Sequence, residues 1–167
     1  MGLDNFPDEY PCKARGVAVF IPDLDKDGNE TFHADGSTKL RFSCQKTMEA
    51  GVCPLHNHPT RPAEGAVYGM LGTDCWYRGK YGTFLLELLE LDDNFLYGGE
   101  GNLIHEEELV SMADEIDEAL LERLDEYGRF EYGHPDGTIE DKAPDIKYLS
   151  WWLRFMAEEG TSVVAWY

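Results

Sequence analysis

Apolar residues recur every three or four positions between Glu106 and Tyr127, and this spacing constrains the fold more than any other feature of the chain. An α-helix turns once in about 3.6 residues, so the pattern places these side chains on one stripe of a helix. The stripe consists of Leu109, Met112, Ala113, Ile116, Leu120, Leu124 and Tyr127. Three glutamates suit the positive start of such a helix, and Gly128 marks its end. A helix with one apolar face must pack against another layer, which the rest of the chain has to provide.

Two further apolar runs predict shorter helices. One covers residues 84–91, and the other begins near Pro144 and ends at Gly160. Proline is tolerated in the first turn of a helix because its missing N–H would have no partner there.

Runs of β-branched and aromatic residues bounded by glycine or proline predict strands. The expected strands lie at residues 16–22, 39–44 and 162–166, with shorter candidates at 31–33 and 66–71. We therefore predict a single α+β domain spanning residues 1–167, in which about three helices pack on one side of a small, mostly antiparallel sheet. Residues 45–75 are rich in proline and glycine and predict a loop-rich segment with few apolar side chains to bury.

The chain carries 33 acidic residues against 14 lysines and arginines, which gives a formal net charge of −19. An excess of carboxylates keeps a protein hydrated and dispersed in concentrated salt, where screening removes most of the self-repulsion. We therefore expect a halophilic source. Direct binding of nucleic acid is disfavoured, because clustered lysine and arginine supply the affinity for phosphates.

No run approaches the roughly 18 consecutive apolar residues that a membrane span requires, so no membrane partner is expected. The first residues lack a basic region followed by an apolar stretch, which argues against a secretory leader. We expect a cytoplasmic protein, or one incorporated in a virus particle. Cysteines in that compartment are reduced and serve as thiols or metal ligands.

The strongest candidates for a chemical site are Cys12, Cys44, Cys53 and Cys75. Zinc takes four nitrogen or sulfur ligands in structural sites and favours thiolates. If the first two long strands pair as a hairpin, Cys12 and Cys44 come together, and the loops that carry the other two cysteines can return to the same edge. The sequence predicts a zinc ion held by these four thiols, which would stabilise the loop-rich segment.

Other interpretations of these cysteines stay open. His56 or His58 could replace one cysteine, since Cys53 and His56 have a spacing that fits one ion. A strand at residues 31–34 inserted in the hairpin would remove Cys12 from the site. The cysteines could also be small buried apolar residues, or one of them could be a nucleophile paired with a histidine.

The segment Asp23-Leu-Asp25-Lys-Asp27-Gly28 opens like a calcium-binding loop, with oxygen ligands at alternate positions. The match fails further on, because Ala34 stands where a bidentate glutamate is required. We expect a polar turn there, with a calcium loop of another type as the alternative.

Arg78 and Lys80 lie between aromatic residues and glycines, just ahead of the helix expected at residues 84–91. Exposed N–H groups at a helix start with neighbouring cations form an anion site, so these residues could bind a phosphate or carboxylate. The competing interpretation is a tight turn in which both bases neutralise nearby acids.

Four short segments carry a family resemblance: Met1-Gly2-Leu3-Asp4, Tyr77-Arg78-Gly79-Lys80, Leu96-Tyr97 and Met112-Ala113. In these segments the chain resembles a group of uncharacterised proteins of prokaryotic viruses and mobile elements that begin Met-Gly-Leu-Asp. The resemblance implies a viral or mobile-element setting and supplies no activity.

These patterns predict a zinc-stabilised interaction or accessory protein without catalysis of its own, whose partner is an unidentified protein. The alternative is a small enzyme that binds an anionic substrate through Arg78 and Lys80 and uses Cys75, His56 or His58 for the chemistry.

Overall fold

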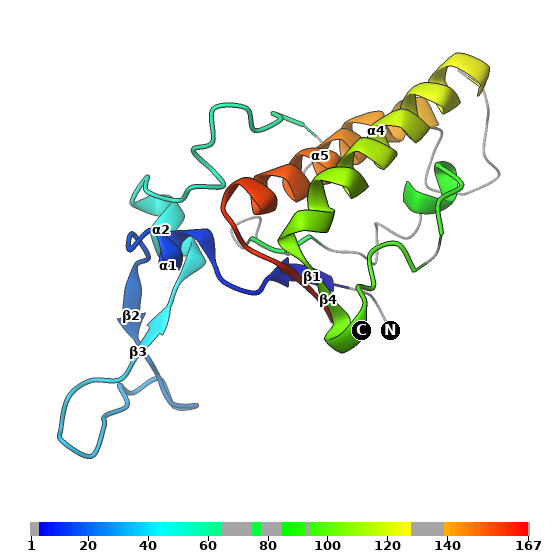
Figure 1. Ribbon diagram of the computed structural model, residues 1–167. Coiled ribbons are helices and arrows are strands. Elements are labelled where there is room, and N and C mark those ends of the chain that lie inside the picture. Colours follow the sequence, from blue (N-terminus) through cyan, green and yellow to red (C-terminus); the bar gives the residue numbers. More distant parts are fainter. Residues whose placement is uncertain (1–3, 65–74, 78–84, 93, 128–138, 167) are drawn as a thin grey trace.

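A computed structural model describes residues 4–64, 75–77, 85–92, 94–127 and 139–166. These residues form helices beside small antiparallel sheets, which confirms the predicted α+β class. The expected single sheet was wrong, because the described strands divide into a three-stranded and a two-stranded sheet. Figure 1 shows the two long helices on one side of the molecule and the two-stranded sheet on the other.

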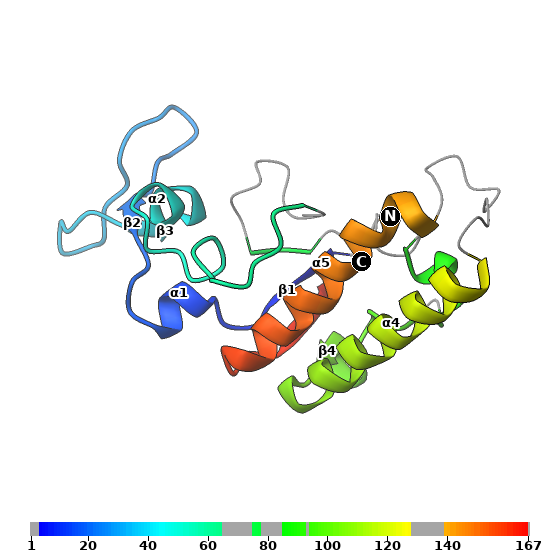
Figure 2. The same ribbon diagram turned by 90° about the horizontal axis from the view of Figure 1, so that it is seen from above.

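The long helices, α4 (Glu106–Tyr127) and α5 (Ile139–Glu158), run antiparallel and lie side by side (Figures 1 and 2). The prediction for α4 is confirmed in its bounds, and Leu109, Ala113, Ile116 and Leu120 of its apolar stripe are buried, with Met112 partly buried. The predicted start of α5 was wrong, because this helix begins at Ile139 and contains Pro144. Acidic residues in its first turn favour the earlier start, although Pro144 removes one N–H from the hydrogen-bond ladder and its ring crowds the carbonyl four residues before it.

A three-stranded antiparallel sheet joins the two ends of the chain. Its order is β1 (Asp4–Pro7), β5 (Val163–Trp166) and β4 (Leu103–Ile104). The prediction of β5 is confirmed, whereas β1 and β4 were not predicted. β1 contains Asp, Asn and Pro, which are poor strand formers, and β4 has only two residues, too few to show an alternating pattern. Tyr77 extends the sheet beyond β1 by exchanging two backbone hydrogen bonds of 2.8 Å with Asn5.

The two-stranded sheet is a hairpin of β2 (Phe20–Pro22) and β3 (Leu40–Phe42), both shorter than predicted. The two strands pair directly, as the hairpin prediction required. The candidate strand at residues 31–33 joins only through isolated bridges, such as that between Phe32 and Thr38. It therefore does not separate the two hairpin strands.

Short helices stand at the base of the hairpin: α1 (Pro11–Ala14) before it and α2 (Cys44–Glu49) after it. The predicted loop-rich segment was wrong at its start, where α2 forms. Ser43 caps this helix by accepting the N–H of Lys46 at 3.2 Å. Residues 85–88 are helical, as predicted, and the candidate strand at 66–71 lies outside the described residues.

The core lies between α4, α5 and the three-stranded sheet. Its largest fully buried side chains are Trp152, Tyr77, Tyr148 and Phe155. Val163 and Ala165 of β5 belong to the same cluster of buried residues, so the last strand closes the core. Among the described helices, none is long and apolar enough to cross a membrane.

Candidate metal centre

All four cysteines predicted as zinc ligands line one cavity. Cys12 lies in α1 and Cys44 begins α2, while Cys53 and Cys75 come from two segments without regular structure. The other lining residues are Tyr10, Pro11, Thr47, Pro54 and Leu55. None of the four cysteines forms a disulfide. Four stretches that are far apart in the sequence thus bring their sulfur-bearing residues to one place.

The hairpin explains how Cys12 and Cys44 come to the same cavity. The carbonyl of Cys12 accepts the N–H of Val17 at 2.9 Å, which ties α1 to the start of the hairpin. At the other end, the Thr47 hydroxyl of α2 accepts the N–H of Val19 at 3.0 Å. Both short helices are therefore held against the same segment just before β2, and each carries one cysteine.

Cys75 is positioned by the core. Its carbonyl accepts the indole N–H of the buried Trp152 at 3.2 Å. The next residue, Trp76, donates its indole N–H to the Tyr10 hydroxyl at 2.6 Å, and its ring stacks on Phe6 at a centroid distance of 4.8 Å. The cavity therefore lies where the hairpin base meets the three-stranded sheet.

The size of the cavity limits what it can hold. Its free volume is about 10 Å³, close to the space that one water molecule needs. Pockets for organic ligands measure roughly 300–1,000 Å³. As the described residues line it, the cavity has room for a single ion and is far smaller than a pocket for an organic ligand.

The thiols share the cavity without forming a ligand cage. Within the described residues, no three His, Cys, Asp or Glu side chains are arranged so that they could hold a metal ion. The donor chemistry suits zinc, since sulfur is a favoured ligand in closed structural sites. Binding would therefore require the four side chains to turn toward one point in the cavity.

Burial raises the pKa of the Cys53 thiol, and the backbone N–H groups of His56 and Leu55 counter part of this effect. Burial also raises the pKa of the Cys12 thiol, with a smaller contribution from nearby Cys53. Because an ordinary thiol has a pKa of about 8.5, both groups are neutral at pH 7 in the absence of a cation. Binding of a metal ion would then release protons.

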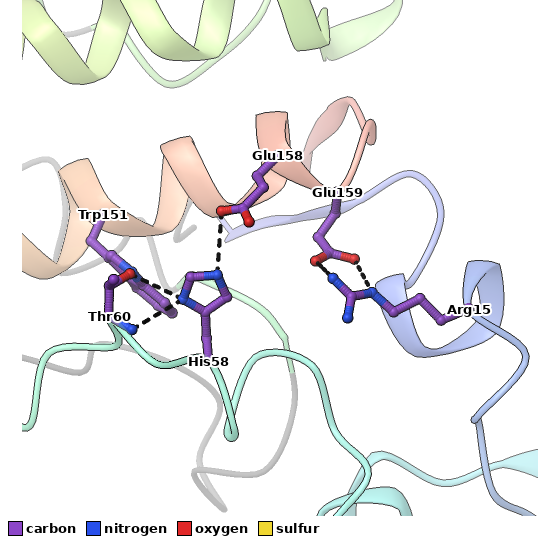
Figure 3. Close-up of polar contacts among 6 residues, drawn as sticks. All are labelled: Arg15, His58, Thr60, Trp151, Glu158 and Glu159. Carbon is purple, nitrogen blue, oxygen red and sulfur yellow. Dashed lines mark hydrogen bonds and ion pairs between the residues drawn. The ribbon is translucent and has the colours of Figure 1, made fainter.

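The two histidines weighed as substitute ligands lie in different surroundings. His56 Nδ1 is 3.0 Å from the Cys53 sulfur, so it stays beside the cavity. His58 points to α5, where its Nε2 is 3.2 Å from the Glu158 carboxylate (Figure 3). Its ring also packs edge-on against Phe155. Of the two, only His56 is placed to join the cysteines.

The contact of His58 ties this region to the end of α5. A second tie is the ion pair of Arg15 with Glu159, in which Arg15 Nε donates to the carboxylate at 2.8 Å (Figure 3). Sequence reasoning missed both ties. The sequence did contain a signal, the consecutive glutamates Glu158 and Glu159 at the predicted C-terminal end of a helix. Carboxylates there interact unfavourably with the helix dipole, and a nearby positive charge would stabilise them.

The segment weighed as a calcium-binding loop forms a polar turn. Asp25 turns a carboxylate oxygen back to the N–H groups of Asp27 and Asn29, at 2.8 and 2.9 Å. These hydrogen bonds close the predicted polar turn and lower the pKa of the Asp25 carboxyl. Arg78 and Lys80, the predicted anion site, lie outside the described residues.

Comparison with known proteins adds no assignment to these observations: no protein-family model, no curated protein and no solved structure matches the chain.

Proposed function

We propose that this chain is a zinc-stabilised interaction or accessory protein without catalysis of its own. The observation that carries the proposal is the single cavity lined by Cys12, Cys44, Cys53 and Cys75. Four sulfur ligands make a closed site, in which zinc stabilises the fold and has no free position for a substrate. The small volume of the cavity supports this closed type of site over a catalytic one.

An ion at this place would stabilise a part of the chain that has little core of its own. Of the described residues between 11 and 64, only Pro11, Cys12, Thr47 and Leu55 are buried, and most of the hairpin is exposed. Bonds from Cys12 and Cys44 would fix the hairpin base, and a bond from Cys75 would fix it to the core. Structural zinc sites supply folding free energy in this way in small domains.

The acidic composition supports a salt-rich setting for the protein. We place it in the cytoplasm of a halophile, or in a virus or mobile element of one, where an excess of carboxylates keeps proteins dispersed. This setting is independent of the zinc site and is tested separately below.

The zinc site is tested by measuring metal content in purified, reduced protein. We expect one zinc per chain, and cobalt substitution should give the charge-transfer bands of thiolate ligation. Each of the four Cys→Ser variants should retain less than about a tenth of the wild-type zinc, because every thiol closes the same site. Substitution of the exposed His105, His105→Ala, is the matched control and should leave the metal content unchanged.

His56→Ala separates the two ligand sets. Full zinc content in His56→Ala supports a site of four cysteines. If His56→Ala loses its zinc and one of the Cys→Ser variants keeps it, the fourth ligand is His56 and not that cysteine. Purified protein that takes up no zinc would overturn the proposal. A water-bound position on the cobalt ion would instead favour the enzyme.

A further inference from the structure

The three-stranded sheet has two faces of different character. Val163 and Ala165 of β5 are buried in the core, so the alternating residues Val164 and Trp166 point to the opposite face. Phe6 of β1 lies opposite Val164 in the register and shares this face. β1 and β5 lie side by side below the long helices (Figure 1). We call the side of the sheet turned away from the core the outer face.

Aromatic rings gather on the outer face. Trp76 stacks on Phe6, with an angle of 23° between the ring planes. It also meets Trp166 edge to face, with ring centroids 6.2 Å apart and planes at 89°. Trp166 is 61% exposed, so its indole offers a large π surface to a binding partner.

The rings continue as a row toward the hairpin. The hydroxyl of Tyr10 accepts the indole N–H of Trp76, and its ring packs on Phe42 at a centroid distance of 5.0 Å. Phe42 meets the exposed Phe20 at 6.2 Å. The aromatic row therefore consists of Trp166, Trp76, Phe6, Tyr10, Phe42 and Phe20. Rings held by such contacts lose little conformational entropy when a partner covers them.

One part of the row already holds a cation. Lys13 Nζ lies 5.1 Å from the ring centroid of Tyr10 and 4.9 Å from that of Phe42. A cation within about 6 Å of a ring centroid is attracted by the negative face of the π system, and indole attracts it most strongly. Lys13 thus gives, within this chain, an example of the group that suits the faces of the two indoles.

The described segments of this sheet are acidic, which favours the same kind of group. Residues 4–10, 75–77, 100–104 and 161–166 contain no lysine or arginine. Their acidic residues are Asp4, Asp8, Glu9 and Glu100. Asp4 lies opposite Trp166 in the register, so its carboxylate is on the outer face. A cation there gains from both rings and carboxylates, whereas an acidic peptide or the phosphates of a nucleic acid would be repelled.

We propose that the aromatic row binds a basic, arginine-containing segment of a partner protein, with guanidinium groups on the faces of Trp76 and Trp166. Arginine suits the indoles better than lysine, because its planar guanidinium stacks on aromatic rings and is more weakly hydrated than an ammonium group. The proposal rests on the proposed role as an interaction protein and names the chemistry of the partner. It does not depend on zinc.

The test is a titration of the full chain with an acetylated and amidated Gly-Arg-Gly-Gly-Arg-Gly peptide. It is done in about 0.5 M KCl, which screens attraction to the rest of the acidic surface. The matched ligand carries citrulline in place of arginine, which keeps the planar shape and removes the charge. We expect the indole N–H signals of Trp76 and Trp166 to shift in NMR spectra. The citrulline peptide should bind about threefold more weakly or worse, as expected for loss of exposed cation–π contacts.

Variants locate the contact on the protein. Trp166→Ser removes the exposed ring and should weaken binding of the arginine peptide about threefold or more. Trp166→Phe keeps a π face and should restore part of the affinity. Leu121→Ser is the matched control, because Leu121 is 64% exposed but lies on α4, and it should leave the affinity unchanged.

Three results overturn the proposal. The first is that the signals of Trp76 and Trp166 stay unshifted at millimolar peptide. The second is equal binding of the arginine and citrulline peptides, which would assign the rings to a neutral ligand. The third is that Leu121→Ser weakens binding as much as Trp166→Ser, which would indicate attraction to the acidic surface as a whole. Zinc is measured in the same samples: zinc-bound protein that does not bind the peptide rejects only this surface, and zinc-free protein that binds it rejects only the metal site.

Discussion

Glu158 ends α5 and Glu159 follows it, at the negative end of the helix dipole, which disfavours carboxylates. Each contacts a side chain from a distant segment: Glu158 lies beside the His58 ring, and Glu159 pairs with the Arg15 guanidinium. The second pair is asymmetric, since the Glu159 side chain is 3% exposed and the Arg15 side chain is 54% exposed. A buried carboxylate depends on its partner more than an exposed guanidinium does, because losing the partner leaves the charge without solvation.

Removal of Arg15 should therefore be costly. We expect Arg15→Ala to lower the free energy of unfolding by about 1–3 kcal/mol, the cost of leaving a buried charged group without its hydrogen bonds. In a protein that already carries Glu159→Ala, Arg15→Ala should lower the free energy of unfolding by much less. Denaturant unfolding of the two single variants and the double variant measures this coupling.

Lys46→Ala provides the control for this double-mutant comparison. It breaks an ion pair with Glu49 in which both side chains are more than a third exposed, so it should change stability by less than about 0.5 kcal/mol. Equal effects of Arg15→Ala and Lys46→Ala would show that the tie to α5 adds nothing to stability.

At the scale of elements, β5 is the last strand in the sequence and the middle strand in space. It pairs with β1 on one edge and with β4 on the other, and it places Val163 and Ala165 in the core. A central strand satisfies the backbone groups of both neighbours. The two ends of the chain are therefore held by this one short element.

Deletion of residues 161–167 should abolish folding. The deletion leaves β1 and β4 without β5 as their partner strand and exposes one side of the core. We therefore expect the truncated protein to show no cooperative thermal transition and to be recovered in the insoluble fraction of the cells. Circular dichroism and fractionation of expressing cells measure the two effects.

Trp166→Ser is the control for the deletion. It changes an exposed side chain on the same strand, and the free energy of unfolding should fall by no more than about 1 kcal/mol. A truncated chain that melts cooperatively near the full-length Tm would show that β5 is dispensable.

Charge is divided unevenly over the whole molecule. The segment from α1 to α2 is neutral, whereas α4 is strongly acidic, and the Arg154 guanidinium of α5 lies 2.6 Å from the Asp114 carboxylate and 2.8 Å from that of Asp117. One arginine cannot balance the ten acids of that helix. Mutual repulsion of the remaining carboxylates destabilises the folded state at low ionic strength and is screened by salt.

Salt should therefore stabilise the protein. Raising KCl from about 0.1 M to about 2 M, where the screening length falls below 3 Å, should raise Tm by about 5 °C or more. The double variant Glu115→Gln/Glu118→Gln removes two exposed acids of α4 and should gain less from the same salt. Calorimetry measures both, and a Tm that is flat or falls with salt would contradict salt adaptation.

The sequence by itself determined the elements that local patterns encode. The stripe of α4 shows in periodicity, its ends show in the glutamates and in Gly128, and the alternation around β3 and the apolar run of β5 predict strands. Each of these signals lies within a few neighbouring residues, and therefore the bounds of α4 could be read before any contact was known.

Tertiary structure alone decided which distant segments meet. β1 has no strand pattern and exists because β5 pairs with it, α5 begins earlier than its proline suggested, and His58 lies against Glu158 and away from the cysteines. Residue type alone identified the four cysteines as candidate ligands. They line a common cavity only because the hairpin base, α2 and the core around Trp152 bring them together. Contacts between segments remote in sequence arise from packing of the whole chain, which no local pattern encodes.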